Sequence, residues 1–94
     1  MPAAVRLGDE CTGHGCFGPR VNDEASEDVF INGIGAHREG DHWTTHCCGP
    51  ICHDGVADTG STTVFINGKP AMRIGDAISC GSICAQGSPS VFIG

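Results

Sequence analysis

The sequence has few of the residues that build a large core. Its 94 residues include four Phe, one Trp and no Tyr. A domain of this length buries only about two thirds of the surface that its unfolded chain exposes, and small domains commonly add a disulfide or a metal ion to compensate. We therefore expect a single domain over residues 1–94 that depends on such a staple.

Basic residues and long apolar segments are also scarce. The chain has five Lys and Arg against eleven Asp and Glu, which gives a net charge of -6. Nucleic-acid binding needs clustered basic side chains, so this balance argues against nucleic acid as a partner. No segment approaches the roughly 20 apolar residues of a membrane span, and residues 1–6 lack the pattern of a secretory signal. We therefore expect synthesis and assembly in the cytoplasm.

Glycine and proline, by contrast, are abundant, and both disfavour helices. The segment Val-Phe-Ile-Asn-Gly occurs at residues 29–33 and 64–68, and a shortened copy, Val-Phe-Ile-Gly, occupies residues 91–94. Val, Phe and Ile favour strands, and Asn-Gly tolerates the positive φ angles of a type I′ hairpin turn. The pattern predicts an all-β fold of short hairpins, in which Val and Ile face one side and Phe the other.

A second repeated element, Arg-x-Gly-Asp, occupies residues 6–9, 38–41 and 73–76 and alternates with the first. We expect each copy to form a turn in which the Asp accepts backbone N–H hydrogen bonds and pairs with the Arg. None of the three units can bury its apolar face alone. The repeat therefore predicts three similar walls around a pseudo-threefold axis.

The repeat also aligns three side chains that bind metals. His14 and His46 each lie five residues after the Asp of their turn, and Cys80 lies four residues after Asp76. Equivalent positions around a threefold axis converge, so these three residues are candidate ligands. Structural zinc takes four ligands; His53 is our preferred fourth, with His42 and Cys52 as alternatives. Nitrogen and sulfur donors favour zinc, or iron, over magnesium and calcium.

The remaining Cys and His residues are harder to interpret. Seven cysteines are an odd number, and in a reducing compartment they indicate metal binding more than disulfides. Cys47 and Cys48 flank His46 and would either replace a His ligand or pair with Cys11 or Cys16. Three further expectations concern single residues. We expect Cys84 to be buried, His37 to be solvated and His42 to lie in a turn.

Taken together, these motifs resemble those of the PAAR-repeat proteins, the spike tips of type VI secretion systems and contractile phage tails. The resemblance rests on residues 2–6, the three Arg-x-Gly-Asp turns, residues 13–16, the Ser-x-x-Val-Phe-Ile strands and residues 86–88. It implies a cone of β-hairpins whose zinc, near the point, is held by three His and one Cys. Carried over to this chain, the ligands would be His14, His46, His53 and Cys80.

The resemblance also implies that the base of the cone sits on a trimeric β-helical spike protein of the VgrG type or its phage counterpart. The candidate docking residues are those of the three repeated strands, without a choice between their two faces: Val29, Phe30, Ile31, Val64, Phe65, Ile66, Val91, Phe92 and Ile93. Such a tip would leave the cell with the spike, contact a target membrane transiently and carry effectors. Because the sequence stops just after Ile93, we expect no appended effector domain.

Two other functions compete with this interpretation. A small zinc hydrolase would use three protein ligands and a bound water, with Asp54 or Glu39 as the base. A secreted, disulfide-stapled binding module would instead pair most of its cysteines, whereas the spike tip predicts mostly free or metal-bound thiols. Of the three, the non-catalytic spike tip agrees best with the repeat.

Overall fold

A computed structural model describes all residues 1–94 and contains six short strands and no helix. The strands form three antiparallel hairpins. They are β1 (Phe30–Ile31) with β2 (Ile34–Gly35), β3 (His42–Cys48) with β4 (Ile51–Val56), and β5 (Phe65–Ile66) with β6 (Lys69–Pro70). The all-β prediction is confirmed. No helix is therefore present that would be long and apolar enough to cross a membrane.

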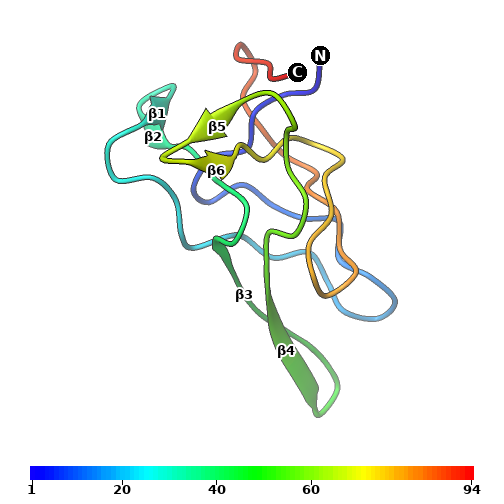
Figure 1. The fold of residues 1–94 in the computed structure, drawn as a ribbon. Helices are drawn as coiled ribbons and strands as arrows, with labels where there is room; N and C mark the ends of the chain where they lie inside the picture. The colour runs from blue at the N-terminus through cyan, green and yellow to red at the C-terminus, as the bar shows by residue number, and fades with distance from the viewer.

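The long hairpin gives the molecule two different ends. The short hairpins β1–β2 and β5–β6 and both chain termini lie together at one end, and β3–β4 projects to the opposite end (Figure 1). The extents along the principal axes are 37 × 24 × 22 Å, so the molecule is elongated. We call the end with the two short hairpins and the termini the base, and the end with β3–β4 the point.

The two short hairpins close through the Asn-Gly turns that the sequence predicts. Asn32 and Asn67 have φ angles of 56° and 54°, and the glycines after them have φ angles of 75° and 78°. A type I′ turn requires positive φ at both central residues, which Asn and Gly accept most readily. These turns explain why the repeated strands end where they do.

The third copy of this strand pairing is made from the two ends of the chain. Ala4 donates a backbone hydrogen bond to Val91, as Ala36 does to Val29 and Ala71 to Val64, and all three bonds measure 3.0 Å. Residues 91–93 thus pair with residues 2–4 in the way that the first strand of each short hairpin pairs with the second. The predicted pseudo-threefold repeat is confirmed, with its third unit closed across the termini.

Three residues meet at the pseudo-threefold axis in a ring of backbone hydrogen bonds. Val5 donates to Met72, Met72 to His37 and His37 to Val5, over 3.0, 3.1 and 3.0 Å. All three side chains are fully buried. The expectation of a solvated His37 is therefore wrong, because this residue precedes the Arg of its turn as Val5 and Met72 do. Burial lowers its pKa below the ordinary value and favours the neutral ring.

The core has two parts. Near the base, one Ala and one Ile from each repeat pack together: Ala4, Ala36, Ala71, Ile31, Ile66 and Ile93. Nearer the point, the fully buried Trp43 lies in a second cluster that includes Cys11 and Cys84. Burial raises the pKa of Cys84 to about 12, and the expectation of a buried Cys84 is confirmed.

The repeated strands alternate between the core and solvent, but not quite as expected. Ile31, Ile66 and Ile93 are buried, whereas Phe30, Phe65 and Phe92 are 58%, 57% and 51% exposed. The valines of these strands stay partly exposed instead of joining the Ile layer. The base therefore carries one exposed Phe from each repeat.

The Arg-x-Gly-Asp segments form the predicted turns. In each, the Asp accepts the backbone N–H of the Arg at 2.8 or 2.9 Å, and its carboxylate also receives the guanidinium. The glycines have φ angles between 85° and 94°, which other residues rarely adopt. These turns start the loops that lead toward the point.

Candidate metal centre

The long hairpin places two histidines side by side. His46 on β3 lies directly opposite His53 on β4, so both side chains project from the same face of the hairpin. The strands connect through Gly49 and Pro50, and Gly49 has a φ of 61° that suits the first position of a type II′ turn. The point of the molecule thus presents a fixed pair of imidazoles.

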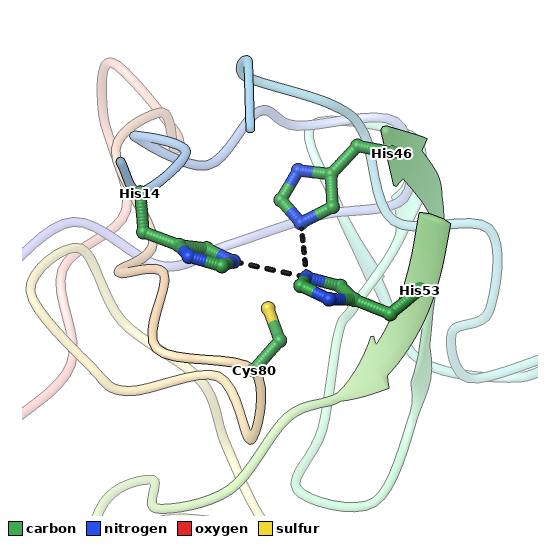
Figure 2. Close-up of side chains that lie close together, drawn as sticks. All are labelled: His14, His46, His53 and Cys80. Atoms are coloured by element: carbon green, nitrogen blue, oxygen red, sulfur yellow. Dashed lines mark hydrogen bonds between the residues drawn. The ribbon is translucent and has the colours of Figure 1, made fainter. Parts of the chain in front are cut away.

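Two loops bring His14 and Cys80 to the same place. His14 and Phe17 exchange backbone hydrogen bonds of 2.9 Å in a tight turn. Gly13 is required there, because a Cβ at this position would lie 2.4 Å from the carbonyl oxygen of Phe17. Cys80 lies in a second turn, which the hydrogen bond from Gly81 to Ile78 closes. Figure 2 shows the four side chains pointing toward one another.

The potential ligand atoms of His14, His46, His53 and Cys80 all lie within 4.8 Å of one another. The Nε2 atom of His53 is 3.0 Å from that of His14 and 2.7 Å from that of His46. The Nδ1 atom of His46 lies 2.8 Å from the carbonyl oxygen of Gly18. Since a carbonyl only accepts, the neutral ring would carry its hydrogen on Nδ1 and leave the lone pair of Nε2 free for a metal.

This donor set fits a metal ion. Burial and the nearby His46 and His53 lower the pKa of His14, so its neutral, ligating form is favoured. Three imidazole nitrogens and one sulfur are ligands that zinc and iron accept. The structure thus brings together the three residues that the repeat offsets select, and His53 with them.

The alternatives for the fourth ligand lie elsewhere. Cys52 is bonded to Cys47 in a disulfide, and Cys48 is bonded to Cys16. Cys11, Cys80 and Cys84 are free. The expectation of mostly free or metal-bound thiols is therefore wrong: four of the seven cysteines are paired. Of the two pairs, only Cys16–Cys48 was among the pairings considered from the sequence.

Phe17 is a residue of the site that was not among the candidates from the sequence. Its ring lies against all three histidines, with centroid distances of 4.8 Å to His14, 5.0 Å to His46 and 4.2 Å to His53. A phenyl ring in this position excludes water from one side of the cluster. The signal was present: Phe17 is the one Phe outside the repeated strands.

Arg20 is the second residue that the sequence did not indicate. It donates a hydrogen bond of 3.1 Å to the sulfur of Cys80 and another of 3.1 Å to that of Cys11. Burial alone would raise the pKa of Cys80, but hydrogen bonds from Ser82 and Arg20 lower it below its ordinary value. The site therefore favours the thiolate form that binds metals.

His42 is not part of this cluster. It is the first residue of β3 rather than a turn residue, and its ring lies between two carboxylates, with Nδ1 2.6 Å from Asp23 and Nε2 2.8 Å from Asp54. The hydrogen bonds with Asp54 and Asp23 raise the pKa of His42 above its ordinary value. This arrangement favours the protonated form of the imidazole on the surface of the hairpin.

The raised pKa of His42 predicts a pH-dependent contribution to stability. The contribution should be fully present below the pKa of an unfolded His, about 6.5, and should disappear as the pH rises through the higher folded value. Because the groups are partly exposed, we expect His42→Gln to cost less than about 1 kcal/mol. Thermal unfolding of both proteins at several pH values tests this, and a larger difference at pH 8.5 than at pH 5.5 would contradict it.

The fold is small and all-β, with an internal threefold repeat, and it carries a cluster of three His and one Cys. These features define the class of protein: a small β-repeat domain with a candidate structural metal site. Comparison with known families then gives the family itself. The sequence matches the PAAR motif over residues 16–85, and the chain belongs to the PAAR-motif family. The resemblance on which the sequence interpretation relied is confirmed.

Three curated relatives are toxins. The chain is 39% identical over 75 residues, 73% of its length, to the NAD(P)(+) glycohydrolase toxin Tse6 and to the (p)ppApp synthetase toxin Tas1, both from Pseudomonas aeruginosa. It is 52% identical over 33 residues, 35% of its length, to the double-stranded DNA deaminase toxin A of Burkholderia cenocepacia. The matches cover 17% of each of the first two toxins and 2% of the third. The shared part is the PAAR region, and the activities in their names belong to those whole proteins.

Proposed function

We propose that this chain is a non-catalytic tip that caps the blunt end of a trimeric β-helical spike protein, of the VgrG type or its phage counterpart. The observation that carries the proposal is the exposure of one Phe from each of the three repeats at the base. A surface with pseudo-threefold symmetry is complementary to the end of a threefold partner. Exposed aromatic side chains are the usual anchors of protein interfaces.

The burial pattern reduces the number of candidate docking residues. Ile31, Ile66 and Ile93 are buried in the core of the protein itself, so they are not available to a partner. Phe30, Phe65 and Phe92 are the main anchors in this proposal, and the partly exposed Val29, Val64 and Val91 lie beside them. The Phe face of the strands thus docks, rather than the Ile face.

The metal centre has a mechanical role in this proposal. His14, His46, His53 and Cys80 come from three separate parts of the chain, so one ion would tie the hairpin β3–β4 to both neighbouring loops. Structural zinc contributes about 10 kcal/mol or more in small domains, which is comparable to the whole stability of an ordinary domain. Zinc is the ion we propose, with iron as the alternative, because both accept this donor set.

The relatives are the basis for proposing a role in toxin delivery. Their shared part is the PAAR region, so we propose that this region serves as the leading tip that brings an effector to a target cell. The chain would assemble with its spike in the cytoplasm and leave the cell with it, contacting the target membrane transiently. Its effectors would be carried by contact, with residues 1–94 acting as a single domain.

A substitution at the base tests the docking proposal. Phe65→Ser should weaken binding to a purified trimeric VgrG-type spike protein from the same organism about tenfold, or ~1.4 kcal/mol. The matched control is Ile51→Ser, because Ile51 is 64% exposed but lies at the point. Calorimetric titration of both variants gives the affinities. Binding by Phe65→Ser at wild-type affinity, or equal loss in the control, would contradict the proposal.

The two disulfides give a specific observation in favour of the secreted binding module. Reduction distinguishes the two functions. A metal-stapled tip with its ion bound should keep its affinity for the spike protein in reductant, whereas a disulfide-stapled module should lose its structure. A zinc hydrolase has less support, because four protein ligands would leave no open position on the ion for a water.

A further inference from the structure

Arg20 differs from the other three arginines in what balances its charge. Arg6, Arg38 and Arg73 each form an ion pair with the Asp of their own turn. Arg20 is only 8% exposed, yet it forms no ion pair with any carboxylate. A buried charge without a partner is costly. The groups that contact Arg20 must therefore compensate for the burial of its charge.

The hydrogen bonds of Arg20 show which groups compensate for its burial. Its Nε donates to the carbonyl oxygen of Thr44 at 2.7 Å, and its two Nη atoms donate to the sulfurs of Cys11 and Cys80 at 3.1 Å. A neutral thiol is a weak acceptor, whereas an ionised acceptor forms a bond about twice as strong. A metal ion keeps its coordinating sulfur ionised. Cys80 is the one sulfur in the candidate metal cluster.

We propose that Arg20 is a positioning residue of the metal centre, which donates a hydrogen bond to the metal-bound sulfur of Cys80 and orients it toward the three histidines. The inference rests on the metal site proposed above. Arg20 also lies over the indole ring of Trp43, with its guanidinium carbon 5.5 Å from the ring centroid. Arg20 thus connects the metal centre, through its hydrogen bond to Cys80, to the core around Trp43.

Cobalt(II) in place of the native ion tests this role, because a thiolate bound to cobalt gives a sulfur-to-metal charge-transfer band. A hydrogen bond to the sulfur stabilises its lone pairs and raises the energy of this band. In Arg20→Met, which retains an apolar side chain against Trp43 but cannot donate, the band should move to longer wavelength. The affinity for the metal should fall about 10–100-fold, as expected for the loss of a residue that orients a ligand.

The matched control is Arg38→Met, which removes a guanidinium that is bonded to Asp41 and Asn67 rather than to sulfur. This variant should lose stability but keep the position of the band. An unchanged band in cobalt-loaded Arg20→Met would overturn the role of Arg20 and leave the metal site intact. If the wild-type protein binds no cobalt, the metal site itself fails.

If Arg20→Met does not fold, the wild-type protein provides a second test. Loading with ¹¹³Cd allows a scalar coupling between the metal and a hydrogen that is bonded to the coordinating sulfur. We expect this coupling at an Nη proton of Arg20. Resolved Nη protons without any coupling to cadmium would overturn the proposal.

Discussion

Replacing Cys80 or His14 with Ala is expected to remove stoichiometric zinc and to lower the melting temperature by about 15 °C or more. Zinc binding contributes on the order of 10 kcal/mol to small domains, and a loss of only about 4 kcal/mol has this effect, because 1 kcal/mol corresponds to roughly 4–8 °C in a domain of this size. Chelation of the wild-type protein should produce the same fall. Elemental analysis and thermal unfolding, with and without a chelator, measure both quantities.

The control for this prediction is His42→Ala, because His42 lies on the same strand as His46 but belongs to the surface cluster with Asp23 and Asp54. This variant should keep its zinc and most of its melting temperature. A wild-type protein without a stoichiometric metal would contradict the metal centre. Metal retained in both Cys80→Ala and His14→Ala would show that other residues bind it.

The parts of the fold that follow from local sequence could be predicted. The Asn-Gly turns and the Arg-x-Gly-Asp turns each depend on a few adjacent residues, and their threefold repetition fixed the arrangement of the hairpins. The same repetition gave His14, His46 and Cys80 by their equal or nearly equal offsets. His53 has no equivalent in the other repeats, so its position opposite His46 became evident only from the register of β3 and β4.

What could not be predicted depends on tertiary contacts or on departures from the repeat. His37 was misjudged because a polar residue in a Gly-rich region is usually solvated, whereas here the pseudo-threefold axis buries it between Val5 and Met72. Phe17 and Arg20 share a different property: each is the one residue of its type outside the repeated elements. In a repeat protein, a residue that the repeat does not require is a useful candidate for the functional site.

The two disulfides have a particular relation to the metal ligands. Cys16 and Cys48 are 32 residues apart, and so are His14 and His46, each of which lies two residues before one of the cysteines. Cys47 and Cys52 are five residues apart and lie within the segment from His46 to His53. Each disulfide thus closes nearly the same loop as a pair of metal ligands. In a reducing compartment the metal alone would close these loops, and in an oxidising one both staples would act.

This overlap predicts that the Cys16–Cys48 disulfide and the metal do not make additive contributions to stability. Closing a loop of this length restricts the unfolded chain and so stabilises the folded state by roughly 3–4 kcal/mol. A bound ion already closes this loop, so the disulfide adds little further stabilisation while the ion is present. Relative to the wild-type protein, the free energy of unfolding of the double variant Cys16→Ser/Cys48→Ser should therefore fall by less than about 1 kcal/mol with zinc bound. After chelation of both proteins, this difference should be larger by about 3 kcal/mol.

Thermal unfolding of the wild-type protein and of this variant, each with and without zinc, gives the coupling free energy. The control is Cys47→Ser/Cys52→Ser, whose shorter loop should give a smaller coupling, because the entropic cost of closing a loop is smaller for a shorter loop. Equal losses in the loaded and the chelated protein would contradict the redundancy of the two staples. A coupling that is larger for the Cys16–Cys48 pair than for the Cys47–Cys52 pair would support an ion that joins His14 to His46, independently of any measurement on the ligands themselves.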